Sequence, residues 1–449
     1  MPRSLADVLA AAKARATRQA ADFSWDPVRG RAGPSPVPRL ETSKPLIALA
    51  GSTGGSVFSH LRDDRFKLLP ADKSWKAPPD LVVLTRAHAL PENPRDLGLS
   101  DEVWRRLASG ETKLVLDISG EGMLHTPELS GRFHRFLATA GIDPANCVHV
   151  TQERAFEADY LAYRVQQGHA GSPFQVLVYD RFIRLLMATV EPDGEAVFHR
   201  RLEAYAAAPR RRTRRFLSLN NTFRPHRALF LMRLLRDGLW DQGHISVGSF
   251  VINRSTIFKR MHAVTELRPL VDELYPLLDE LESRSPSYIG LGGALPYGGS
   301  DDVMITPQMY PEFSDSWFSA VVETDVTPRL HRITEKPFKP LLCFHPFIVL
   351  GPVGALELIR EYGFETFPGF FDESYDQEPG LRERFDDVYG QVGRLCAVDE
   401  AELARRSDAS AEAVVFNAWW GLTQLPRLFR ERIDAAMVDW LIGFVRQGR

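Results

Sequence analysis

The chain has few cysteines, and their arrangement suits neither a metal site nor a disulfide framework. Only three occur in 449 residues, Cys147, Cys343 and Cys396, and they are widely scattered. Their odd number argues against a full set of disulfides, and no pair has the spacing of metal ligands. We therefore expect a reduced, cytoplasmic protein.

Long apolar runs and an excess of charge are also missing. No segment approaches the roughly 20 apolar residues that span a bilayer, and the first residues lack the apolar core of a secretory signal. The net charge of -3 gives no electrostatic basis for binding nucleic acid. Residues 1–23 instead have the pattern of an amphipathic helix with several basic residues. Such a helix is either solvated or disordered, or it makes a peripheral contact with a membrane surface or a partner.

The composition is that of a globular protein large enough for two domains. Hydrophobic residues make up 44% of the chain and charged residues 25%, which is typical of soluble proteins. A single core rarely serves a chain of this length. We expect an N-terminal helix and Pro/Gly-rich linker over 1–44, an N-terminal α/β domain over 45–210, a C-terminal α/β domain over 211–395, and C-terminal helices over 396–449.

Short apolar runs alternate with helical patterns, which predicts an α/β fold with mostly parallel sheets. The runs are interrupted by glycine-rich turns and by amphipathic segments. The first region has strands at 46–50, 81–84 and 114–118 around a helix at 101–109, and the second opens with a strand at 216–219 and a helix at 226–236. The glycine-rich loop 51–56 matches neither a dinucleotide fingerprint nor a Walker A sequence.

The most informative segment is 317–352. A strand-like run ends on Glu323, the tetrapeptide Ile-Thr-Glu-Lys follows at 333–336, and a second apolar run ends on Gly-Pro. This order is typical of polar groups presented at the edge of a nucleotide-binding sheet. The carboxylate of Glu335 can take sugar hydroxyls, and the ammonium of Lys336 can neutralise a phosphate.

A second basic site lies at the turn between the strand 216–219 and its helix. Arg224 and Arg227 stand where free backbone N–H groups and the helix dipole already favour an anion. An arginine fork binds phosphate in a bidentate manner. The alternative is that both arginines are solvated charges at the start of a surface helix.

Acidic residues in the first α/β region are candidates for acid–base chemistry. Asp117 directly follows the apolar run 114–116, and Glu121 comes next between two glycines. Either can act as a general base at the carboxyl end of a parallel strand, or it is a solvated loop acid. The acids Asp301, Asp302 and Asp325 form no metal-ligand pattern, so we expect no metal.

These segments resemble the nucleotide-sugar half of α1,3-fucosyltransferase-like and exostosin-like glycosyltransferases. The fucosyltransferase pattern is a strand F-x-x-x-x-E-N-S, then Y-I-T-E-K, a helix, and a strand ending in V-L-G-P. Its counterparts here are 318–323, 333–336 and 349–352, and 216–227 matches the family's upstream strand and its helix opened by arginine. The chain departs from the pattern at Thr324-Asp325, where the family has Asn-Ser.

The resemblance implies a GT-B architecture, with two Rossmann-like domains facing across a cleft and the donor bound mainly by the C-terminal one. It implies that Lys336 and Arg227 hold the donor diphosphate, that Glu335 holds ribose or donor-sugar hydroxyls, and that Glu323 braces the site. It also implies inversion of configuration at the transferred sugar.

The resulting hypothesis is a hexosyltransferase, fucosyltransferase-like in its donor half, that needs neither a cofactor nor a metal. Its donor is a nucleoside-diphosphate sugar, and its acceptor is a hydroxyl of a glycan, a lipid-linked molecule or a protein. Arg224 joins Lys336 and Arg227 at the diphosphate, and Glu121 is the first candidate for the base, with Asp117 the second. The alternative is a GT-B-like protein that binds a ligand or partner without catalysis.

Overall fold

Two parallel β-sheets organise the chain into two units. The computed structural model describes residues 4–32, 46–50, 67–69, 78–85, 89–120, 123–190, 193–207, 212–248, 253–285 and 310–447. Unit 1 consists of 1–21, 186–329 and 333–426, and unit 2 consists of 22–185, 330–332 and 427–449. Each unit carries one of the sheets, which confirms the predicted α/β class with two Rossmann-like parts.

Unit 2 contains a six-stranded sheet in the order β4-β3-β5-β6-β7-β8. All of its neighbouring strands are parallel. The strand order reverses between β3 and β5, because β4 lies on the far side of β3. The strands are β3 (Leu46–Ala50), β4 (Lys67–Leu68), β5 (Leu81–Thr85), β6 (Lys113–Asp117), β7 (Cys147–Thr151) and β8 (Gln175–Val178), and a separate antiparallel pair joins β1 (Trp25–Asp26) to β2 (Arg31–Ala32).

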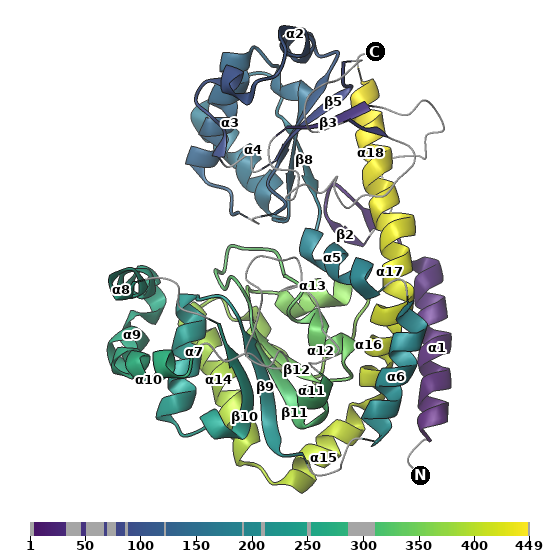
Figure 1. Ribbon diagram of the computed structural model, residues 1–449, viewed down its shortest axis with the longest axis vertical. Coiled ribbons are helices and arrows are strands. Elements are labelled where there is room, and N and C mark those ends of the chain that lie inside the picture. The colour runs from purple at the N-terminus through teal and green to yellow at the C-terminus, as the bar shows by residue number, and fades with distance from the viewer. Residues whose placement is uncertain are drawn as a thin grey trace. The chain divides into compact units, whose positions relative to one another are not determined.

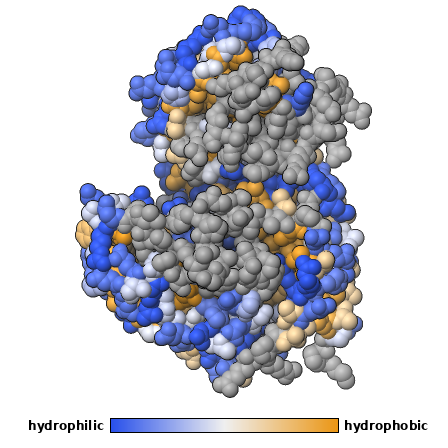
Figure 2. Space-filling view, viewed as in Figure 1, coloured by the Kyte–Doolittle hydropathy of each residue, from blue (hydrophilic) through white to orange (hydrophobic). Residues whose placement is uncertain are grey.

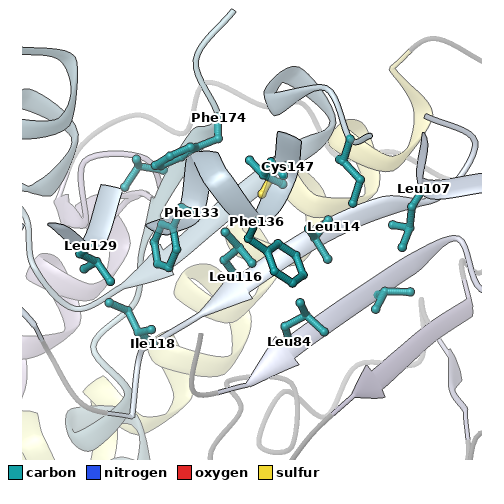
Figure 3. Packing of buried hydrophobic residues seen from close by; sticks show 14 of the residues in the cluster. Leu84, Leu107, Leu114, Leu116, Ile118, Leu129, Phe133, Phe136, Cys147 and Phe174 are labelled. Atoms are coloured by element: carbon teal, nitrogen blue, oxygen red, sulfur yellow. The ribbon is translucent and has the colours of Figure 1, made fainter. Parts of the chain in front are cut away.

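Helices cover both faces of this sheet. Leu84, Leu114 and Leu116 of the sheet gather with Phe133 and Phe136 of α3 in one apolar cluster, as Figure 3 shows. The opposite face packs against α18, far along the chain. Apolar side chains therefore alternate between two cores, as a strand's period of two requires. The helices are α2 (Asp101–Ser109), α3 (Pro127–Ala140), α4 (Phe156–Gln167) and α18 (Ala435–Arg446).

Unit 1 contains a four-stranded sheet in the order β10-β9-β11-β12. The strands are β9 (Arg214–Asn220), β10 (Gly243–Val247), β11 (Ser316–Val322) and β12 (Phe347–Leu350), and all pair in parallel. The order reverses between β9 and β11, and the carboxyl ends of strands at such a reversal are where open α/β sheets bind ligands. These strands lie among the green helices in Figure 1.

Some helices of unit 1 connect its strands, and others follow the last strand, β12. Helix α7 begins with Pro225 at its first position, one residue before the expected start, and Gly238, with φ of 66°, follows its end. Hydrophilic residues cover most of the α8–α10 region at the left of Figure 2. The helices are α6 (Gly194–Ala207), α7 (Pro225–Arg236), α8 (Arg254–Ala263), α9 (Arg268–Leu274), α10 (Leu278–Ser283), α11 (Tyr310–Ser314), α12 (Phe338–Leu342), α13 (Ala355–Glu361), α14 (Leu381–Ala397), α15 (Glu400–Ala409) and α16 (Ala411–Trp419).

The N-terminal helix α1 (Leu5–Asp22) packs on unit 1. One side of α1 is buried through Val8, Ala12, Ala16 and Ala20. Its Lys13 ammonium lies 4.1 Å from the centroid of the Trp419 ring, a cation–π contact. The expectation of a solvated helix or disordered tail is therefore wrong. None of the helices in the described ranges is long and apolar enough to cross a membrane.

The C-terminal helical run passes from unit 1 to unit 2. After α16, two π-helical segments flank the short α17 (Leu425–Leu428), and α18 completes the run. In unit 2 the buried carboxylate of Asp434 pairs with Arg184 at 2.7 Å and accepts a hydrogen bond from Tyr179.

The boundaries of unit 1 and unit 2 differ from the domain boundaries expected from the sequence. Unit 1 resumes at 186, within α5 (Arg181–Val190), because α6 packs against the C-terminal helices of that unit. The C-terminal helices divide between the two units, and α1 belongs to unit 1. Segments distant in sequence therefore complete each core.

Candidate functional site

The candidate site lies at the carboxyl edge of the unit 1 sheet. Asn220 ends β9 beside Val247 of β10, and β11 ends at Val322 directly before Glu323. The strand order reverses between β9 and β11. Ligands of open α/β sheets bind at such a position.

Glu323 ties the end of β11 to the Ile-Thr-Glu-Lys segment. Its carboxylate is 1% exposed and accepts hydrogen bonds from the Thr334 N–H at 2.8 Å, the Thr334 hydroxyl at 2.7 Å and the Thr324 N–H at 2.8 Å. Its own N–H donates to Leu350 O at the end of β12. A buried carboxylate with three donors is well satisfied. This side chain therefore fixes the geometry of the loop.

Lys336 lies within the polar network that Glu323 anchors. Its ammonium donates to the hydroxyls of Thr324 at 2.9 Å and Thr334 at 3.1 Å, and to the Glu335 carboxylate at 3.2 Å. The side chain is 22% exposed, so part of it faces solvent. An ammonium held in this way is placed in advance for an anion.

Glu335 is buried between two lysines. Lys339 lies 4.0 Å from the same carboxylate oxygen that Lys336 contacts. Burial alone would raise the pKa of Glu335, but the charges of Lys336 and Lys339 outweigh it and lower that pKa below its ordinary value. The carboxylate is therefore ionised at neutral pH.

Both predicted arginines reach the Thr324 loop. Arg224, partly buried, donates to Thr324 O at 3.2 Å. Arg227 is 3% exposed and donates to Val322 O and Thr222 O, each at 3.0 Å, and to the Thr324 hydroxyl at 3.4 Å. Burial lowers the pKa of Arg227 to about 10, which leaves it cationic at neutral pH.

His226, between the two arginines, is a structural member of the site. Its Nε2 lies 2.9 Å from Glu323 O, so that nitrogen carries the proton. Burial, with Arg227 alongside, lowers the pKa of His226 to about 3. A neutral imidazole therefore links the start of α7 to the end of β11.

Arg384 joins the loops that follow β11 and β12. Its buried guanidinium donates to Gly351 O at 3.0 Å and to Val326 O at 2.7 Å. The start of the adjacent helix α13 already binds a carboxylate of the same chain, because Leu356 N–H donates to Asp376 at 3.0 Å. Helix α7, by contrast, has no side-chain cap at its start, which leaves that end the better place for an outside anion.

The carboxyl edge of the unit 2 sheet holds the predicted acid Asp117. Its buried carboxylate accepts hydrogen bonds from the Ser119 N–H at 2.9 Å and the Ser119 hydroxyl at 2.7 Å. Glu121 lies outside the described residues, as do Asp301, Asp302 and the glycine-rich loop 51–56.

Glu153, which no sequence motif singles out, lies at the same edge. It lies two residues beyond the end of β7 and accepts hydrogen bonds from the N–H groups of His331 at 2.9 Å and Ala155 at 3.1 Å. Burial raises its pKa from 4.5 to about 7. A place within two residues of the end of a buried strand is the signal that could have identified it, as the end of the strand did for Asp117.

The structure brings together Arg224, Arg227, Glu323, Glu335 and Lys336, all five of the predicted donor-binding residues. Asp325, weighed above as a metal ligand, instead closes a local turn with Thr327. Within the part of the chain that the structure describes, no three His, Cys, Asp or Glu side chains gather as a metal site would require.

Comparisons with known proteins give one distant structural likeness. No protein-family model matches the chain, and no curated protein matches its sequence. A crystal structure of α,α-trehalose 6-phosphate synthase from Burkholderia multivorans is similar over 82% of this chain and 73% of its own, with 12% identity and a TM-score of 0.34. A likeness this distant assigns neither a family nor an activity.

Proposed function

We propose that this chain is a GT-B glycosyltransferase that moves a sugar from a nucleoside-diphosphate donor to a hydroxyl acceptor. The observation that carries the proposal is the convergence of three cationic side chains on one residue. Arg224, Arg227 and Lys336 all donate to oxygen atoms of Thr324 at the carboxyl edge of the unit 1 sheet. Such a concentration of positive charge at the strand-order reversal suits a diphosphate.

The residues of this edge divide into ligand contacts and supports. Lys336 and Arg224, both partly exposed, are the groups that would touch the diphosphate oxygens. Arg227 is engaged with the carbonyls of Val322 and Thr222, so it acts through the shape and charge of the loop. Glu323 braces the same loop, and Glu335 is the candidate acceptor for hydroxyls of the ribose or the donor sugar.

The reaction needs charge stabilisation and a base. The acceptor oxygen attacks the anomeric carbon, and the bond from that carbon to the diphosphate breaks with its electron pair leaving on the nucleoside diphosphate. Lys336 and Arg224 stabilise the developing negative charge without an obligatory metal. The acceptor proton passes to a carboxylate of unit 2, for which Glu121 and Asp117 are candidates and Glu153 a third.

The stereochemistry of transfer, the donor sugar class and the acceptor are proposed from the family resemblance. It favours an inverting, fucosyltransferase-like hexosyl transfer, with a glycan, a lipid-linked molecule or a protein as the acceptor. The protein would work in the cytoplasm, with a peripheral membrane contact where the acceptor is a lipid. A non-catalytic, GT-B-like binding protein is the alternative, because the Asn-Ser that follows the strand glutamate in the family is Thr324-Asp325 here.

The test combines binding with turnover. A thermal-shift panel of nucleoside diphosphates and their sugars identifies the donor, since a specific ligand stabilises the folded state by mass action. Lys336→Ala should weaken binding of that donor at least tenfold and abolish transfer, whereas Lys259→Ala, at an exposed position of α8, should change neither. Unchanged donor affinity and KM in Lys336→Ala would refute the diphosphate assignment.

Donor hydrolysis separates the two functions. A glycosyltransferase releases some sugar to water in the absence of acceptor, and Lys336→Ala should slow this release. A wild-type protein that binds the donor and releases no sugar would favour the non-catalytic alternative.

A further inference from the structure

The carboxamide of Asn220 is a buried polar group at the edge of the candidate donor site. Asn220 is the last residue of β9, pairs with Val247 of β10, and is 3% exposed. Its backbone is fully engaged, because its N–H donates to the Ser246 hydroxyl at 2.9 Å and its carbonyl accepts from Gly248 N–H at 2.7 Å. The backbone of Asn220 is therefore fixed by the end of the neighbouring strand β10.

The orientation of the carboxamide follows from its neighbour Ser218. The Ser218 hydroxyl donates its one proton to Ala320 O at 2.9 Å, so it can only accept from Asn220. The atom of Asn220 that lies 3.0 Å from this hydroxyl is thus the donor Nδ2. A flipped amide would place two acceptors against each other.

The amide oxygen is left without a donor. Oδ1 of Asn220 is buried and has no hydrogen-bond partner among the residues that the structure describes. Buried polar atoms are nearly always paired, and an unpaired one at a ligand-binding edge points to a missing partner. Because Oδ1 only accepts, that partner must carry a proton on oxygen or nitrogen.

We propose that Asn220 is a specificity-determining residue of the donor site, and that Oδ1 accepts a hydrogen bond from a hydroxyl or N–H group of the nucleoside or sugar part of the donor. The diphosphate cannot fill this role, because its oxygens are deprotonated at neutral pH. The inference rests on the proposed function and extends it: Lys336 and Arg224 bind charge, and Asn220 selects what the diphosphate carries.

The decisive variant is Asn220→Leu, which keeps the side-chain shape and removes the polar atoms. Affinity for inorganic pyrophosphate should stay within twofold of wild type. If the ribose or the base donates to Oδ1, the affinity for the nucleoside diphosphate should fall at least tenfold. If a sugar hydroxyl donates to Oδ1, only the affinity for the complete nucleotide sugar should fall. Isothermal titration calorimetry measures all three, and Asn220→Ala tests the same pattern should the leucine variant not fold.

Asn417 provides a matched control. It is buried in the same unit, and its amide is satisfied on both sides by the backbone of Glu365, at 2.8 and 2.9 Å. Asn417→Leu should lower the Tm and leave ligand affinities unchanged. Asn220→Leu should change the Tm of the ligand-free protein little, because it loses the Nδ2 bond to Ser218 but also removes an unpaired buried acceptor.

Two results would overturn the inference. One is an Asn220→Leu protein that has the Tm of wild type and binds every ligand as wild type does. The other is a lowered Tm with unchanged affinities, which would show that a buried water, and not a ligand, satisfies Oδ1. Pyrophosphate binding by the wild type tests the cationic site alone. A wild-type protein that does not bind pyrophosphate would therefore contradict the proposed function, whatever Asn220 does.

Discussion

Glu323→Gln tests whether the carboxylate at the end of β11 holds Thr324 and the Ile-Thr-Glu-Lys segment in place. In the wild type one carboxylate oxygen accepts from Thr334 N–H, and the other accepts from the Thr334 hydroxyl and from Thr324 N–H. Glutamine keeps the shape and one accepting oxygen, so the first bond survives. Its NH₂ group replaces the second oxygen and faces the Thr324 N–H, donor against donor.

The expected loss of stability has two parts. A buried N–H left without an acceptor costs about 1–3 kcal/mol, and a hydrogen bond to a neutral acceptor is weaker than one to a charged acceptor by about 1 kcal/mol. The sum is about 2–4 kcal/mol. For a unit of this size it lowers the Tm by roughly 4–16 °C. Differential scanning calorimetry measures the shift in the transition of unit 1.

Function should change together with stability. The hydroxyls of Thr324 and Thr334 hold the Lys336 ammonium at 2.9 and 3.1 Å. Loosening them should weaken binding of a nucleoside diphosphate by about tenfold, which corresponds to about 1.4 kcal/mol. Isothermal titration calorimetry below the new Tm measures the affinity.

Glu373→Gln is the matched control. Its carboxylate also accepts from a backbone N–H, that of Phe367 at 2.7 Å, and from a threonine hydroxyl, that of Thr366 at 3.0 Å. The same chemical change there should lower the Tm and leave the nucleotide affinity as in wild type. A Glu323→Gln protein with both the Tm and the affinity of wild type would refute the reasoning.

Three further predictions concern unit 2 and the N-terminal helix. Since the folded-state pKa of Glu153 is raised from 4.5 to about 7, its favourable contribution is present below pH 4.5 and is lost as the pH rises to about 7. Glu153→Gln should therefore gain stability relative to wild type between pH 5 and 8 in urea unfolding, and parallel curves would contradict this. Asp434→Asn should cost on the order of 3 kcal/mol by calorimetry, because Arg184 loses its buried counter-charge. The apolar double variant Arg184→Met/Asp434→Leu should recover most of that loss, and no recovery would count against the pairing. Ala16→Asp should detach α1 and speed tryptic cleavage within it, whereas the exposed control Ala14→Asp should not; equal cleavage rates would show that α1 is not held by its buried face.

Much of the fold follows from local patterns in the sequence. Apolar runs separated by helical segments predicted parallel sheets, and the strand expected at 114–118 is β6 at Lys113–Asp117. The Ile-Thr-Glu-Lys segment and the arginine turn were expected to share a site, and both reach Thr324. Such local signals suffice because strand ends and helix starts meet at one edge of a parallel sheet.

The supports of the site could not be predicted in the same way. The role of Arg384 depends on two carbonyls from loops well upstream of it in sequence, Gly351 O and Val326 O. The role proposed for Asn220 could not be predicted either. Its oxygen is identified as unpaired only because the Ser218 hydroxyl donates its proton to Ala320 O and accepts from Asn220 Nδ2. The resemblance implies that Arg227 holds the diphosphate, and the sequence did not predict the hydrogen bonds of its guanidinium to Val322 O and Thr222 O. Each of these roles depends on atoms that only the folded chain brings together.

The packing of α18 on the unit 2 sheet has a consequence for the order of folding. During synthesis the strands β3 to β8 emerge first, but the side chains that cover one face of their sheet belong to Ala435–Arg446. All of the unit 1 sheet is synthesised in between. That face therefore remains exposed on the ribosome until the C-terminal helix appears, so unit 2 can reach its final core only after translation of unit 1. Nascent chains stalled before 435 should accordingly bind chaperones, and the full-length chain released from the ribosome should not.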